Sequence, residues 1–110
     1  MKVLLDENLD HRLKNHIPNS FTVFEEKWSS LKNGELLKVM ASGGFTFLLS
    51  ADANMPYQQS EKKIIEAGLT VIILQGKNEI AEHLKRIEQI KDLIHAPDTP
   101  KGFIILNYKK

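Results

Sequence analysis

Short apolar runs of strand length alternate along the chain with longer segments whose apolar residues recur at helical spacing. This alternating order predicts βαβ units with right-handed crossovers, and therefore a mainly parallel sheet with helices on both faces. The expected fold class is α/β, with three layers in the order α/β/α and the last strand at a sheet edge. The predicted strands span 2–5, 21–24, 45–50, 70–74 and 103–106, and the predicted helices span 9–17, 33–42, 56–67 and 78–95.

Residues that cap or break helices mark the ends of these segments. Asn8 is the predicted N-cap of the first helix, and Asn33 and Asn78 cap the second and the fourth. Gly68 ends the third helix. The fourth helix, 78–95, carries a strong apolar stripe. Most of this stripe should face the core, and any surplus would serve a homodimer interface.

Length and composition suit a single domain that spans residues 1–110. Hydrophobic residues make up 42% of the chain, which is enough for a core, yet no apolar run approaches the roughly 20 residues that a membrane span needs. The chain has no cysteine, so disulfides and thiolate metal sites are excluded. Acidic residues follow the first strand too soon for a secretory signal. We therefore expect a cytoplasmic protein that makes no membrane contact.

The charge balance argues against binding of nucleic acid by overall charge alone. The 15 Lys and Arg residues and 14 Asp and Glu residues give a formal net charge of +1. An RNA partner would therefore have to meet locally concentrated basic residues. Three short basic clusters offer this, although an ordinary solvated surface is the more common explanation of each. They are Lys62-Lys63, Lys85-Arg86 and Lys109-Lys110.

Acidic residues follow two of the most apolar predicted strands. Asp6 comes directly after the first strand and Asp52 shortly after the third, and Glu35 lies in the first turn of the helix between them. Because parallel strands end at the same edge of a sheet, we expect the three carboxylates to meet there. Such a cluster is repulsive unless a cation joins it, and oxygen ligands favour Mg²⁺ or Mn²⁺. Asn54 would add a neutral oxygen or order a metal-bound water.

A metal held in this way can activate water and stabilise the charge that develops on a phosphate. The chemistry that it serves most directly is hydrolysis of a phosphodiester. A purely structural interpretation of the acids is also open. Acidic residues and Asn are common turn and cap residues after a strand, and Glu35 is favoured near a helix start by the helix dipole.

Three segments resemble the acidic blocks of small, stand-alone PIN-like proteins. They are residues 4–9 (LLDENL), 31–37 (LKNGELL) and 49–54 (LSADAN). Their order and spacing match over about the first 60 residues, and the remainder agrees only in the order of elements. The resemblance implies a PIN-like α/β/α domain and a metal-dependent ribonuclease, which in related bacterial proteins often serves as the toxin of a toxin–antitoxin pair. The implied partners are RNA and an antitoxin protein.

By position in these blocks, the resemblance makes Asp6, Glu35 and Asp52 the metal ligands and catalytic residues. Asn54 falls where many PIN nucleases have a further aspartate, and this difference removes one negative charge from the site. A non-catalytic PIN-like module that binds RNA or a partner protein is therefore the second hypothesis. A third is a receiver-like domain, with Asp52 as the phosphate acceptor and Lys77 as the lysine that follows a later strand.

Several polar and aromatic residues near these blocks are candidates for substrate binding, and each also has an ordinary structural interpretation. Trp28 could stack on a base or cover the edge of the core, and His11 could act as a general base or lie on the surface. The residues predicted to bind substrate are Asn8, Arg12, Lys32, Tyr57 and Gln58.

Overall fold

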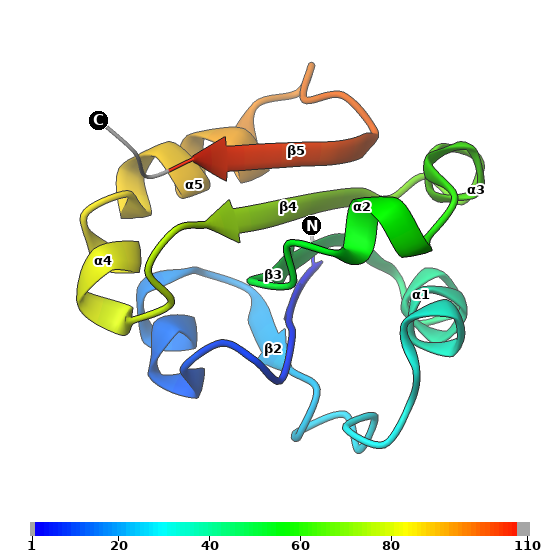
Figure 1. Cartoon of the computed structure of the whole chain (residues 1–110), viewed down its shortest axis with the longest axis horizontal. Helices are drawn as coiled ribbons and strands as arrows, with labels where there is room; N and C mark the ends of the chain where they lie inside the picture. Colours follow the sequence, from blue (N-terminus) through cyan, green and yellow to red (C-terminus); the bar gives the residue numbers. More distant parts are fainter. Residues whose placement is uncertain (1, 108–110) are drawn as a thin grey trace.

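The structure is a computed structural model that describes residues 2–107. Five parallel strands form one sheet in the order β2-β1-β3-β4-β5 (Figure 1). The first and third strands therefore lie side by side, and the last strand is at an edge, as predicted. The strands are β1 (Lys2–Leu5), β2 (Ser20–Thr22), β3 (Phe45–Ser50), β4 (Thr70–Gln75) and β5 (Gly102–Asn107).

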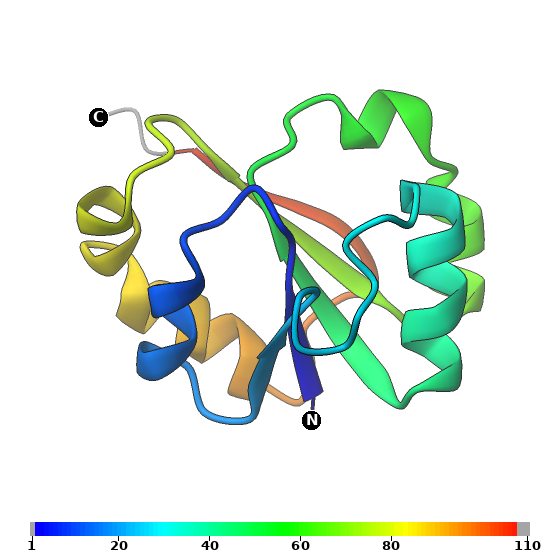
Figure 2. The ribbon, with the colours of Figure 1, turned by 90° about the horizontal axis from the view of Figure 1, so that it is seen from below.

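Helices cover both faces of the sheet, which confirms the predicted three-layer α/β/α architecture (Figure 2). One layer consists of η1 (His11–His16), α4 (Ile80–Leu84) and α5 (Ile87–His95). The opposite layer consists of α1 (Asn33–Ser42), α2 (Met55–Gln58) and α3 (Glu61–Glu66).

Alternate residues of the central strands supply the two halves of the core, because successive side chains of a strand point to opposite faces. From β3, Phe47 and Leu49 pack in the layer of η1 and α5, whereas Leu48 packs in the layer of α1 and α3. Strands buried on both faces require a nearly continuous apolar sequence, and the TVIIL run of β4 has one.

The register of β1 and β3 determines which residues leave the sheet together. Leu5 lies opposite Leu49, so Asp6 and Ser50 follow at equivalent heights on the carboxyl edge. The backbone amide of Asp6 donates to the carbonyl of Leu49 at 2.9 Å, which extends the pairing by one residue. The two chain segments that follow β1 and β3 are thereby held next to each other.

Three of the predicted helices differ from the observed ones. The segment 9–17 contains only the 3₁₀ helix η1 over His11–His16. Its N-cap is Asp10 rather than Asn8, because the Asp10 carboxylate accepts from the amide of Arg12. The segment 56–67 divides into α2 and α3, with Ser60 capping α3 through the amide of Lys63. The segment 78–95 divides into α4 and α5.

The break between α4 and α5 falls at Lys85 and Arg86, one of the predicted basic clusters. Both halves pack against the same face of the sheet: Leu84 comes from α4, and Ile90 and Ile94 come from α5. The apolar stripe of the segment therefore belongs to the core, and the homodimer stays a prediction.

Other expectations concern single positions. Lys32, not Asn33, occupies the N-cap position of α1, and Asn33 is its first residue. Trp28 is half-buried and meets Phe45 edge-on at 5.6 Å between ring centroids, as in the core-covering interpretation.

Lys109 and Lys110 lie outside the described residues. Over residues 2–107, no helix combines the length and apolarity that crossing a membrane requires.

Candidate functional site at the carboxyl edge

A buried serine joins two of the predicted acids at the carboxyl edge of the sheet. The Ser50 hydroxyl, at the end of β3, donates to Asp6 Oδ2 at 2.7 Å. Ser50 Oγ in turn accepts from the backbone amide of Asp52 at 3.1 Å. Ser50 is fully buried and Asp6 is only 8% exposed. The structure thus brings Asp6 and Asp52 together, as the parallel arrangement of their strands predicts.

Burial and neighbouring charge both act on Asp6. Desolvation is the largest effect and raises the pKa of its carboxyl, and the charge of Asp52 raises it further. The hydrogen bonds from Ser50 and from the amide of Glu7 act in the opposite direction but are outweighed. Asp6 is therefore a carboxylate whose negative charge is poorly compensated by the described residues around it.

Asp52 is oriented by two further donors. Its Oδ1 accepts from the amide of Asn54 at 3.0 Å, and its Oδ2 accepts from the side-chain amide of Asn33 at 3.4 Å. Asn54 thus contributes its backbone to the site, while its own side chain is exposed. Asn33 enters from the first turn of α1, which brings a third segment of the chain to the edge.

Glu35 does not join this pair, although it lies in the same first turn of α1. Asn33 and Glu35 are two residues apart, which places them about 200° apart around a helix axis. Asn33 faces Asp52, so Glu35 faces elsewhere and is exposed. Within residues 2–107, no three His, Cys, Asp or Glu side chains are grouped so that they could hold a metal ion. Two of the three predicted acids therefore meet.

A polar network extends from the two acids to the helix layer on the other face. The side chain of Asn8 bridges to β3, accepting from the amide of Ala51 at 3.1 Å and donating to Ser50 Oγ at 3.4 Å. The backbone carbonyl of Asn8 accepts from the side-chain amide of Asn78 at 2.7 Å, and Asn78 Oδ1 lies 2.8 Å from His83 Nε2. Asn8 is thus a connector between strand ends, a role different from the predicted helix cap.

The other predicted substrate-binding residues lie on the surface. Arg12 makes an ion pair with Asp10 at 2.6 Å, and this guanidinium holds the pKa of the Asp10 carboxyl well below its usual range. Lys32 and Gln58 are exposed, and the Tyr57 side chain is 88% exposed. His11 is exposed as well. Lys77, the lysine of the receiver-like hypothesis, makes an ion pair with Glu79 at 3.1 Å.

Sequence reasoning missed Ser50, Asn33, Asn78 and His83 as members of the site. For Ser50 a signal was available, since it is a hydroxyl residue closing an otherwise apolar strand that an acid soon follows. Asn33 and Asn78 resembled ordinary helix caps. For His83 the signal was its helical spacing from Ile87, Ile90 and Ile94, which places it on the apolar stripe of the segment 78–95.

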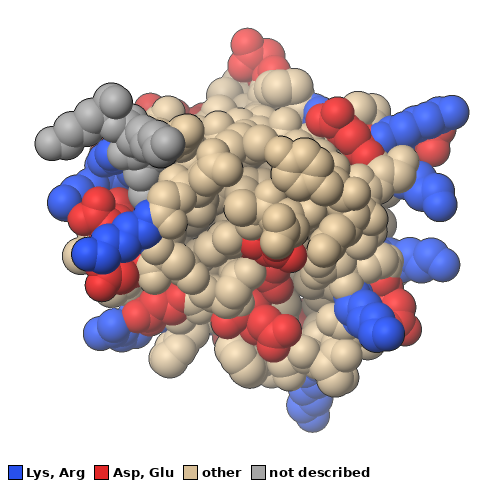
Figure 3. Space-filling model, in the orientation of Figure 1, with Lys and Arg blue, Asp and Glu red and all other residues tan. Residues whose placement is uncertain are grey.

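The Lys and Arg side chains leave the middle of one face of the molecule free. In Figure 3 they lie around the periphery of the face shown, whereas acidic side chains lie both near its middle and at its periphery. A cation could therefore reach the centre of the face without meeting like charge.

Comparisons with models of protein families, with curated proteins and with solved structures give no match.

The donor set of the site fits a hard divalent cation. Asp6 and Asp52 offer carboxylate oxygens from neighbouring strands, and each oxygen accepts one hydrogen bond in the structure. Mg²⁺ is commonly held by only one or two carboxylates and completes its shell with water and substrate phosphate. A cation between the two acids would also compensate the buried charge of Asp6, whose pKa is raised mainly by desolvation and to a smaller extent by the charge of Asp52.

Proposed function

We propose that the protein is a metal-dependent, PIN-like ribonuclease in which Asp6 and Asp52 hold Mg²⁺ or Mn²⁺. The observation that carries the proposal is the pair of carboxylates at the ends of β1 and β3, joined through the buried hydroxyl of Ser50. When bound, the cation would supply Lewis-acid stabilisation of a phosphate and a more acidic water.

The residues of the chain would then orient the reaction. Ser50 and Asn33 hold the two carboxylates in place, and Asn8 ties the β1 end to the β3 end. Glu35, the third acid of the sequence prediction, is exposed and faces away from the pair, so the proposal leaves it outside the metal shell. Exposed Lys32, Tyr57 and Gln58 are proposed to contact the RNA, and the resemblance adds a cytoplasmic toxin role with an antitoxin partner.

Cleavage of a fluorescent single-stranded RNA in the presence of Mn²⁺ tests the proposal. We expect Asp6→Asn and Asp52→Asn to reduce the rate by about 100-fold or more, because each removes a carboxylate from the metal shell. Asp98→Asn, an exposed substitution far along the chain, is the matched control and should keep the rate. Equal cleavage by all three variants, or equal cleavage in EDTA, would show that the acids do not carry the activity.

A non-catalytic PIN-like module that binds RNA or a partner protein is the second candidate. Two observations favour it: Glu35 stands apart from the other acids, and Asn54 replaces an acid that would strengthen a metal site. This candidate predicts no cleavage with either metal, together with partner binding that survives Asp6→Asn.

A further inference from the structure

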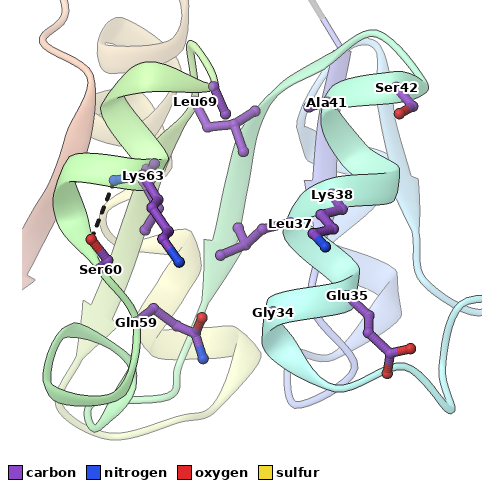
Figure 4. Close-up of a pocket in the computed structure, with 12 residues that line it drawn as sticks. Gly34, Glu35, Leu37, Lys38, Ala41, Ser42, Gln59, Ser60, Lys63 and Leu69 are labelled. Atoms are coloured by element: carbon purple, nitrogen blue, oxygen red, sulfur yellow. Dashed lines mark hydrogen bonds between the residues drawn. The ribbon is translucent and has the colours of Figure 1, made fainter.

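A groove of about 680 Å³ runs between α1 and α3, on the sheet face opposite to α5. Leu37 reaches into it from α1, and Leu69 lies at its floor (Figure 4). Ile64 also lines the groove, and so do Ala41 and Ala67, whose side chains are small. Aliphatic side chains thus line the floor of the groove, and polar side chains line its rim. One of these is Glu35, in the first turn of α1, whose carboxylate points away from the opening (Figure 4).

Two lysines stand on opposite walls of this groove. Lys38 comes from α1 and Lys63 from α3, and Figure 4 shows Lys63 extending along the opening. Among the described residues, no carboxylate lies within ion-pair distance of either ammonium group. Several other lysines on the surface, such as Lys85 with Glu82, do have such a partner.

The lining distinguishes between two kinds of occupant. Single-stranded nucleic acid is usually held by bases that stack on aromatic or arginine side chains. Neither residue type lines this groove. Aliphatic pockets instead accept aliphatic side chains, and lysines at the rim attract carboxylates.

We propose that the groove between α1 and α3 docks an acidic amphipathic segment of a partner protein. Aliphatic side chains of that segment, spaced as on one face of a helix, would fill the floor over Leu37, Ile64 and Leu69. Its Asp or Glu residues would pair with Lys38 and Lys63. Docking is independent of hydrolysis, because none of these residues belongs to the Asp6 and Asp52 network.

The test selects binders from a displayed library of random peptides of about 16 residues, a length that spans roughly 24 Å as a helix. This length matches the 32 × 27 × 26 Å extents of the molecule. Ala41→Glu places a larger, charged side chain in the groove. Selection on the whole protein, with the Ala41→Glu protein as the counter-selection target, therefore enriches peptides that bind in the groove. The enriched peptides are then measured by fluorescence anisotropy against purified variants.

The decisive variant is Lys38→Glu/Lys63→Glu, which reverses both rim charges at exposed positions. We expect it to weaken the enriched peptides by about tenfold or more, corresponding to about 1.4 kcal/mol. The matched control, Lys62→Glu/Lys101→Glu, changes the same charge at exposed lysines outside the groove and should stay within about twofold. Supporting peptides carry aliphatic residues at helical spacing and an excess of Asp and Glu.

Other outcomes overturn the proposal. The groove is not an acidic-peptide site if no groove-dependent peptide is enriched, if the enriched peptides are basic, or if both charge-reversal proteins bind them equally. Binding of a single-stranded RNA oligonucleotide that depends on Lys38 and Lys63, without peptide binding, would assign the groove to nucleic acid instead. Asp6→Asn and Asp52→Asn should leave peptide affinity unchanged. The ribonuclease proposal and the docking proposal can therefore fail independently of each other.

Discussion

The hydroxyl of Ser50 makes three hydrogen bonds inside a fully buried position. Ser50→Ala leaves Asp6 Oδ2 and the amide of Asp52 without this partner. Because unsatisfied buried polar groups are costly, we expect the free energy of unfolding to fall by about 2 kcal/mol at neutral pH, as measured by urea denaturation. Ser42→Ala, at an exposed position, is the matched control and should change it by less than about 0.5 kcal/mol.

The decrease in the free energy of unfolding caused by Ser50→Ala should also depend on pH. The pKa of Asp6 is already raised, and removing the donor that lowers it raises it further. A native carboxyl with a raised pKa holds its proton longer than the unfolded chain, so stability falls as the pH rises from 3.8 through the native pKa. The cost of Ser50→Ala should therefore be smaller in acid. An equal cost at all pH values would show that Asp6 is not the affected group.

His83 titrates in the opposite sense. Burial lowers the pKa of this histidine below 6.5, although the charges of Glu82 and Asp10 act to raise it. The unfolded chain then binds a proton before the native protein does, so the free energy of unfolding should decrease as the pH falls below 6.5.

His83→Gln isolates this contribution. Glutamine can still donate to Asn78 Oδ1, which is the acceptor because the Asn78 amide nitrogen donates to Asn8. We expect the variant to flatten the pH dependence of urea unfolding just below pH 6.5, while His95→Gln, on the exposed end of α5, keeps it. A slope identical to that of the natural chain would assign the dependence to other groups.

At the scale of elements, the start of β5 depends on a glycine and a glutamate from α3. Gly102 has a φ of +101°, and the Glu61 carboxylate accepts from the amide of the next residue, Phe103, at 3.0 Å. A Cβ at Gly102 would lie 2.7 Å from Glu61 Oε2. Gly102→Ala therefore combines backbone strain with loss of this contact on the edge strand.

Gly44→Ala separates the two effects. Gly44 also has a positive φ, +82°, but a Cβ there meets no atom within 4 Å. We expect Gly44→Ala to lower the free energy of unfolding by about 1 kcal/mol, and Gly102→Ala by about 2–3 kcal/mol, in urea titrations. If Gly44→Ala costs as much as Gly102→Ala, the contact with Glu61 contributes nothing.

The helices and strands also show which features of the fold could be predicted from the sequence. The strands and their parallel order follow from apolar runs and alternation, so the layers were predictable. The segment 9–17 was expected to be α-helical because Leu9, Leu13 and Ile17 are four residues apart, and all three are indeed buried. Its backbone is nevertheless 3₁₀, since Asp10 starts the helix late and Ile17 is already extended before Pro18. Side-chain spacing identifies the buried face and not the type of helix.

At the scale of the whole molecule, the candidate site was predictable only where strand direction determines it. Asp6 and Asp52 meet because their strands are parallel neighbours. The alternation of elements predicts the parallel direction, whereas the adjacency of β1 and β3 comes from the structure. The place of Glu35 depends on the rotation of α1 about its axis, and neither the apolar pattern nor the acidic blocks specify that rotation closely enough. Asn33 consequently takes the position beside Asp52 that was expected for Glu35.

This geometry leads to a prediction about metal and stability. A cation that binds the native Asp6–Asp52 pair, and not the unfolded chain, stabilises the fold; at about a hundredfold excess over Kd the gain is about 2.7 kcal/mol. For a domain of this size the gain corresponds to a rise in Tm on the order of 10 °C. Calorimetry with added Mn²⁺ measures it, and EDTA should reverse it.

The variants make the prediction specific to the site. Asp6→Asn and Asp52→Asn should lose the Mn²⁺-dependent rise, whereas Glu35→Gln should keep most of it, because Glu35 faces away from the pair. Asp98→Asn controls for the loss of one exposed carboxylate. An equal rise in all four variants would mean that Mn²⁺ binds elsewhere. Loss of the rise in Glu35→Gln would mean instead that α1 turns on metal binding to bring the third acid to the edge.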